Sequence, residues 1–253
     1  MIFARLALNS NMVSLSREAV AGQSVSLNVI CNILPLSVVQ DDMTETPLNV
    51  DPQCPSQVAF TPGCTYTIRS KPGNSISAGN YQILALTGRG GSDAREAVAI
   101  GADTCYSAGD IVETKPGVTA GPIRQGMNTR FDEYSGGLDP NEYPPDTNIK
   151  TGITYAQYIS GLSAYKESPS HPGIPNRRVF LLPIINQSEF DNGRDQVRIA
   201  KFGVFFMRNK VANGNGGEIT AEFISSRVVV GDGGYDAAAG APTVQAAVPV
   251  LYR

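Results

Sequence analysis

The chain has 253 residues, 42% of them hydrophobic, with 20 basic and 23 acidic residues that leave a net charge of −3. This length and apolar content allow one large or two small folded domains and exclude a disordered chain. The balanced charge, with no run of Lys or Arg, argues against nucleic acid as a partner. A single His and no Trp do not favour a metal enzyme or an acid–base enzyme.

The N-terminal third shows the period-two alternation and short apolar runs that are typical of strands. The predicted strand segments are 12–28 (two strands joined near Gly22), 27–39, 66–68 and 80–86. Residues 41–62 are polar and rich in Pro, which predicts a loop.

Three short helices are predicted in the middle of the chain. Ser92 or Asp93 would cap the first, which covers residues 94–100 and ends at Gly101. The other two are indicated by apolar side chains at helical spacing, namely Ile123, Met127 and Phe131, then Tyr155, Ile159 and Leu162.

The last third predicts β structure. The apolar run 178–185 is typical of a central strand, and Asn192-Gly193 is a hairpin signal before long strands at 197–207 and 218–230. Residues 244–252 would close the sheet. The expected fold class is therefore α+β: β-rich, with mostly antiparallel sheets and a few short helices. We expect a single domain over 1–253; the alternative is two lobes, 1–134 and 176–253, joined by 135–175.

The four cysteines are spaced too widely for the close ligand pairs of a zinc site. An even number at such spacing favours two disulfides, with four free thiols as the alternative. We expect Cys54–Cys64, because Pro55 and the Thr61-Pro62-Gly63 turn would fold that stretch back on itself, and Cys31–Cys105 follows. Disulfides would place the chain in an oxidising compartment.

Two motifs lie where a reactive site could occur. Gly88-Arg89-Gly90-Gly91 stands where a dinucleotide-binding fingerprint would, but Asp93 replaces its third glycine and would repel a pyrophosphate. His171 lies in a Pro-flanked loop without a G-x-S-x-G elbow, so an exposed loop histidine is expected there rather than a catalytic one.

Acidic residues offer a possible Ca²⁺ site without EF-hand spacing. The candidates are Asp132, Glu133, Asp139, Glu142 and Asp146, with Asp232 and Asp236 further along. Paired carboxylates could also serve glycoside hydrolysis. Solvated acidic loops are the default interpretation, and no cofactor, metal or catalytic residue is predicted.

Several Gly- and Pro-containing motifs occur in a definite order along the chain. They are Pro72-Gly73-Asn74-Ser75-Ile76, Gly79-Asn80-Tyr81, Gly90-Gly91-Ser92-Asp93, Gly109-Asp110-Ile111-Val112-Glu113-Thr114-Lys115-Pro116-Gly117 and Gly121-Pro122-Ile123-Arg124-Gln125-Gly126. With residues 3–22, and more weakly 177–185 and 202–206, this order resembles the TadE/TadG-like proteins of Flp (tight-adherence) pilus systems. The resemblance covers about half of the chain.

The resemblance implies a non-enzymatic structural or assembly component of a pilus or related bacterial envelope apparatus, in the periplasm or at the cell surface. Its partners would be other pilus or envelope proteins. Family members carry one transmembrane helix near the start, whereas no segment here reaches the ~18 apolar residues of such a helix, so an anchor is expected upstream of Met1. The alternatives are a secreted carbohydrate-active or other hydrolase, with Asp132 and Glu133 converging in a cleft, and a Ca²⁺-stabilised adhesin.

Overall fold

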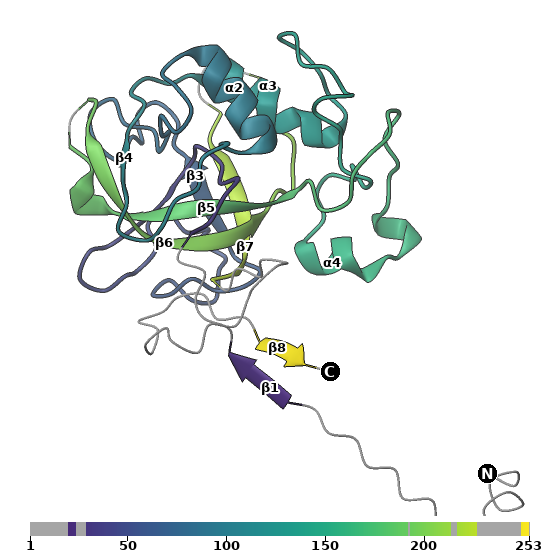
Figure 1. Cartoon of the computed structure of the whole chain (residues 1–253), viewed down its shortest axis with the longest axis horizontal. Helices are drawn as coiled ribbons and strands as arrows, with labels where there is room; N and C mark the ends of the chain where they lie inside the picture. Colours follow the sequence, from purple (N-terminus) through teal and green to yellow (C-terminus); the bar gives the residue numbers. More distant parts are fainter. Residues whose placement is uncertain (1–19, 24–28, 192, 214–216, 227–248, 253) are drawn as a thin grey trace, which may run out of the picture.

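A computed structural model of the chain describes residues 20–23, 29–191, 193–213, 217–226 and 249–252 (Figure 1). It confirms the predicted fold class, because a mixed, mostly antiparallel six-stranded sheet is combined with a few short helices. The strand order is β2-β5-β6-β7-β3, and β4 pairs with β6 beside this path. The strands are β2 (Val38–Gln40), β3 (Thr65–Arg69), β4 (Ile111–Glu113), β5 (Val179–Asn186), β6 (Gln196–Phe206) and β7 (Ile219–Ser225).

Strand β5 lies inside the sheet, as its continuous apolar run predicted. It pairs in parallel with β2 and antiparallel with β6. Both of its faces are covered: Leu182 and Ile184 enter one hydrophobic core, and Ile185, after a register shift, enters a second core. Because a strand covered on both faces has no solvent side, it needs no polar alternation.

The N- and C-terminal parts of the chain share this one sheet. Strand β3 pairs with β7, β2 with β5, and β4 with β6. The segment 47–51 then connects the two outer strands: Leu48 N–H donates to Val39 O (2.9 Å), and Thr67 N–H donates to Asn49 O (3.2 Å). The backbone edges of β2 and β3 are thereby hydrogen-bonded by a loop.

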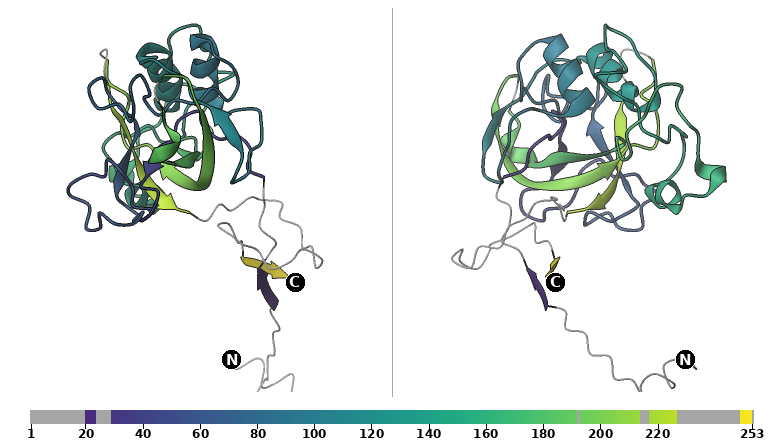
Figure 2. Two further views of the ribbon diagram at one scale, coloured as in Figure 1. Left: turned by 90° about the vertical axis from the view of Figure 1, so that its left-hand side faces the viewer. Right: turned by 45° about the vertical axis from the view of Figure 1, so that its right-hand side comes forward.

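Two helices, α2 (Gly91–Ile100) and α3 (Ala120–Asn128), pack together over one face of the sheet (Figures 1 and 2). They approach closely at Gly126, where an added Cβ would lie 2.1 Å from Arg95 O. The predicted stripe is confirmed, since Ile123 and Met127 are buried in the first core together with Phe131 of the short 3₁₀ helix η1 (Thr129–Phe131).

The start of α2 differs from the prediction. The residue at the N-cap is Gly90, and the Asp93 carboxylate, one turn into the helix, accepts the Gly90 N–H (2.9 Å). The carboxylate is therefore used within the chain to satisfy an orphan backbone donor at the helix start. The predicted end at Gly101 is correct.

The prediction of a strand at 80–86 was wrong. Only isolated bridges occur there, at Asn80, Ile83 and Leu84. Gln82 has a φ of 64°, which a strand does not allow, and its buried side-chain amide donates to Ser37 O and Thr67 O (both 3.0 Å). A side chain, rather than a regular strand ladder, thus satisfies the carbonyls beside this segment.

Two other strand predictions are corrected. In 27–39 the structure has isolated bridges at Ile30 and Leu36 and a strand only from Val38. The chain end does not close the main sheet: β8 (Pro249–Tyr252) pairs with β1 (Val20–Gln23) in a separate two-stranded sheet (Figure 2). Gly22 lies within β1 and is not a turn. The rest of 12–28, Asn192, 227–230 and 244–248 lie outside the described residues.

The third helix, α4 (Tyr155–Ser160), is shorter than predicted and begins at a capping box formed by Thr154 and Gln157. Its predicted apolar stripe is wrong, because Ile159 and Leu162 are exposed (60% and 59%). Its aromatic side chains, Tyr155 and Tyr158, instead contact the ring of Phe206. Among the described residues no helix has the length and apolar character needed to cross a membrane.

Candidate functional site

Two disulfides hold the loops of this fold, with the pairing predicted from the sequence. The long disulfide joins Cys31 to Cys105, 74 residues apart, and the short disulfide joins Cys54 to Cys64, 10 residues apart. No described cysteine is free. Two disulfides in one chain indicate an oxidising, extracytoplasmic environment.

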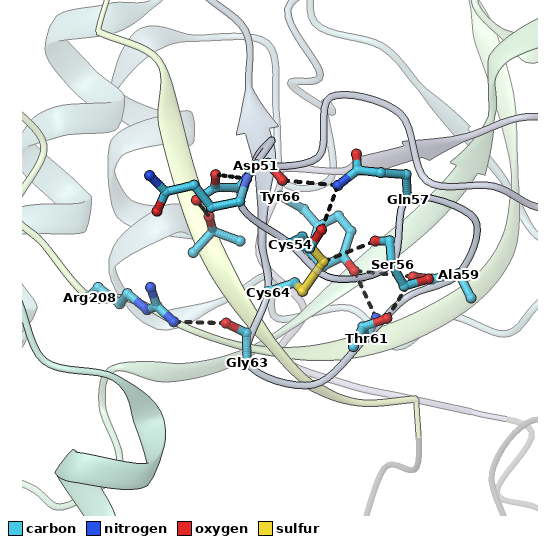
Figure 3. The surroundings of a disulfide bond; sticks show 12 residues. Asp51, Cys54, Ser56, Gln57, Ala59, Thr61, Gly63, Cys64, Tyr66 and Arg208 are labelled. Carbon is cyan, nitrogen blue, oxygen red and sulfur yellow. Dashed lines mark hydrogen bonds between the residues drawn. A yellow bond between two sulfur atoms is a disulfide. The ribbon is translucent and has the colours of Figure 1, made fainter.

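The short disulfide fixes a loop against the edge of β3 (Figure 3). Within that loop Cys54 N–H donates to Asp51 O (2.9 Å), and the Gln57 side-chain amide donates to the same carbonyl (3.2 Å). At its other end the hydroxyl oxygen of Tyr66 accepts the Thr61 N–H (2.7 Å). Residues 51–64 are therefore ordered by covalent and hydrogen bonds rather than by secondary structure.

A groove of about 390 Å³ opens beside this loop, on the outer face of β3 and β7. It is lined by Asn49, Val50, Asp51, Pro52, Thr65, Thr67, Asn74, Glu218 and Thr220. The threonines face outward because alternate residues of the same strands, Tyr66 and Ala221, point into the first core.

The chemistry of the groove is polar and acidic. Two carboxylates and no Lys or Arg are among its lining residues, so its local charge disfavours anions. The Asp51 carboxylate is already oriented, because it accepts Gln53 N–H (2.9 Å) and Thr65 Oγ1 (3.1 Å). Glu218 makes no hydrogen bond or ion pair within the described part of the chain. Such a surface can bind hydroxyl or amine groups.

His171 is held more firmly than the sequence suggested. Its Nδ1 lies 2.7 Å from Asp132 Oδ1, and its ring meets the edge of Tyr134. Burial raises the pKa of Asp132, but hydrogen bonds from the His171 ring and from the Ser170 and His171 backbone N–H groups outweigh it, so the pKa is lowered. Burial, aided by the Asp132 charge, raises the pKa of Tyr134 to about 12. His171 is exposed, as predicted for this Pro-flanked loop, and the Asp132 carboxylate is its hydrogen-bond partner.

A buried polar network is centred on Arg178, just before β5. Its guanidinium donates to four backbone carbonyls at 2.8–3.0 Å, those of Asn148, Lys150, Met207 and Arg208. It also lies between two aromatic rings, 4.6 Å from the centroids of Phe131 and Phe206. Burial lowers its pKa to about 10, which still leaves it charged at neutral pH.

Asp146 accompanies Arg178 in this network and is fully buried. Its carboxylate accepts the Tyr158 hydroxyl (2.9 Å), the Asn148 N–H (2.8 Å) and the Arg178 N–H (3.0 Å). Burial, and next the Asp146 charge, raise the pKa of Tyr158 well above its usual range. Arg69 has a similar function elsewhere: it is buried and donates to the carbonyls of Val118 and Gly217. These arginines fix loops on the sheet.

The acidic residues proposed as calcium ligands do not converge. Asp132 binds His171, Glu133 lies near Arg124 and Lys210, Asp139 accepts from Asn141, and Asp146 is in the network above. No group of three or more His, Cys, Asp or Glu side chains within the described ranges could hold a metal ion. Asp132 and Glu133, the carboxylates considered for a hydrolase, have separate partners. Asp232 and Asp236 lie outside the described residues.

No family model, curated protein or solved structure matches this chain.

The site residues that sequence reasoning missed are the buried arginines and Gln82. One signal was available: Arg177-Arg178 directly precedes a strand covered on both faces, where a cation must find internal partners.

Proposed function

We propose that this chain is a non-enzymatic structural or assembly component of a bacterial envelope apparatus of the Flp (tight-adherence) pilus kind. The observation that carries the extracytoplasmic part of this proposal is the pair of disulfides, which tie irregular loops to one sheet. Such bonds persist in the periplasm or at the cell surface and are reduced in the cytosol.

The use of the polar residues supports a structural role. The side chains of Arg178 and Arg69 donate to backbone carbonyls, and the Asp146 carboxylate accepts backbone N–H groups. These side chains therefore order loops. No Ser, Thr or Cys side chain of the described residues is hydrogen-bonded to the His171 ring, so the Asp132–His171 pair has no nucleophile to activate.

The motif order that resembles TadE/TadG-like proteins supports the Flp-pilus part. In the motif 109–117, Gly109 and Gly117 have φ angles of 96° and 91°, flanking strand β4. Side chains rarely adopt such angles, so these motif glycines shape the turns on either side of a strand. The motifs therefore specify backbone geometry, as expected for an assembly module.

Deletion of the gene in its own bacterium tests the proposal. We expect a loss of surface Flp pili, counted by electron microscopy, and restoration by the wild-type gene. The protein should fractionate with the envelope and resist thiol labelling until it is reduced. Unchanged piliation in the deletion strain would remove the pilus assignment, and cytosolic protein with reactive thiols would remove the extracytoplasmic one.

A saccharide-binding adhesin is a second candidate, favoured by the groove on β3 and β7. Its hydroxyl, amide and carboxylate side chains match the hydrogen-bonding groups of a sugar. Glu218→Gln, with Glu167→Gln as an exposed control, tests this in a glycan-binding screen. Selective loss of a glycan signal in Glu218→Gln would support the candidate, and no binding by the wild type would exclude it.

A further inference from the structure

A second cluster of cations lies beside the Arg178 network and has no carboxylate of its own: Asp146, the carboxylate of that network, is also the one that attracts Arg130 and Arg177. Arg130, in the 3₁₀ helix η1, is 2% exposed. Its Nη1 donates weakly to Gly126 O (3.4 Å) and lies 3.7 Å from Met127 Sδ, while its guanidinium lies 5.5 Å from the Phe180 ring. Its Nε is buried and has no hydrogen-bond partner among the described residues.

Arg177, whose charge acts on Arg130, also has a buried N–H group without a hydrogen-bond partner among the described residues. Its Nε donates to Pro144 O (2.9 Å), but its buried Nη2 has no partner in the described part of the chain. The segment 144–146 connects the two arginines, because Asp146 N–H donates to the Arg130 carbonyl (3.0 Å). Burial lowers the pKa of Arg130 and repulsion from Arg177 lowers it further, while the Asp146 charge offsets part of this shift. The Arg177 side chain and the Arg130 backbone thus contact the same short segment.

The nearby carboxylates do not neutralise these charges. None of Arg130, Arg177 and Arg178 makes an ion pair with a described carboxylate. Asp146, the single carboxylate of the network, already accepts three hydrogen bonds from other groups, and Asp132 is bound to His171. Three guanidinium groups thus share one buried carboxylate, and buried charge without a counter-ion is strongly unfavourable.

We propose that a small oxyanion binds between Arg130 and Arg177, accepting hydrogen bonds from Arg130 Nε and Arg177 Nη2. Guanidinium groups suit the oxygens of phosphate, sulfate or a carboxylate, because charge-assisted bonds form in their plane. A water molecule would satisfy the two N–H groups but would leave the charge uncompensated. The acidic groove on β3 and β7 is excluded as this site, since no basic residue lines it.

Thermal unfolding of the full chain in the presence of inorganic phosphate tests the proposal. Salt and buffer are matched so that ionic strength is constant, and acetate is titrated in parallel to separate a carboxylate from phosphate. Linkage predicts a saturating rise in Tm, about 5–10 °C at a hundredfold excess over the dissociation constant. A response to phosphate identifies a free inorganic anion, and a response to acetate alone identifies a carboxylate; either supports the site.

The variant Arg177→Gln should lose the saturating rise, while Arg194→Gln, the same charge change at an exposed position, should keep it. Far-ultraviolet circular dichroism of each variant checks that it is folded. Phosphate also stabilises proteins by exclusion from their surfaces, and that effect does not saturate. A Tm that responds to neither anion, or that rises equally in Arg177→Gln, would overturn the proposal.

Discussion

The largest stability loss from a single side chain is expected at Arg178. The change Arg178→Met keeps the apolar stem and removes the guanidinium, so four backbone carbonyls, which are buried or partly buried, lose their donor. At about 1 kcal/mol for each hydrogen bond, and about 0.5 kcal/mol for each of the two ring contacts, the free energy of unfolding should fall by about 5 kcal/mol. That is a large part of the stability of an ordinary domain.

Urea unfolding followed by circular dichroism measures this loss. Arg178→Lys should be intermediate, because an ammonium keeps the charge but does not present the planar fork that reaches four carbonyls. Arg198→Met is the matched control: its side chain is exposed and donates to one carbonyl, Gly109 O (2.9 Å), so it should cost less than about 1 kcal/mol.

Two results would refute this reasoning. One is a loss below about 2 kcal/mol in Arg178→Met, which would show that water replaces the guanidinium at little cost. The other is a Lys variant as stable as the wild type, which would show that charge alone, and not the geometry of the hydrogen bonds, matters. If Arg178→Met does not fold, Arg178→Lys still gives the comparison with Arg198→Met.

Three further predictions concern the loops and the helix pair. Replacing both cysteines of the long disulfide with alanine should lower the free energy of unfolding by about 4 kcal/mol, and the same change in the short disulfide by about 3 kcal/mol. The loss is larger for the long disulfide because loop entropy grows with the separation of the cysteines, 74 residues against 10. Calorimetry of the two variants checks this order, and equal losses would contradict it. Asp132→Asn should lower the Tm more at pH 7 than at pH 3. A carboxylate whose folded pKa is lowered contributes fully above its unfolded value of 3.8 and loses this contribution as the pH falls through its folded pKa. A pH-independent Tm difference would refute the ionic interpretation. Gly126→Ala should lower the free energy of unfolding by about 2–3 kcal/mol, since its methyl group would meet Arg95 O at 2.1 Å. Gly121→Ala in the same helix has open space around the new methyl group and should be neutral or stabilising in urea unfolding. Similar losses in both variants would argue against the close helix contact.

Local patterns predicted the elements that local physics controls. The stripe of Ile123 and Met127 lies on a helix face buried against the sheet, and the apolar run 178–185 is a strand with both faces covered. The failures came where side chains replaced regular backbone pairing. Gln82 adopts a left-handed conformation, and its amide bonds two carbonyls across the core, so the apolar run 80–86 is not a strand. No periodic pattern in the sequence indicates that a side chain replaces regular backbone pairing there.

Some features of the candidate site were likewise predictable from local sequence, and others were not. Cysteine number and turn residues predicted both disulfides, because a short stretch that reverses direction brings its own ends together. Three features of the site were not predictable from the sequence: the separate partners of the acidic residues, the contact of Asp132 with His171, and the groove on β3 and β7. Each depends on which segments, far apart in the chain, the fold brings together.

By itself, the sequence determined the fold class, the disulfide partners, the central strand at 178–185 and the apolar face of the helix at Ile123 and Met127, since these depend on residue types within a few positions of each other. Only the tertiary structure decided that β3 pairs with β7, that Arg178 holds four carbonyls, and that Arg130 and Arg177 each carry a buried N–H group with no partner among the described residues. The physical reason is that burial and hydrogen-bond satisfaction belong to the packed chain, in which each buried polar group takes whichever partner the fold brings within about 3 Å.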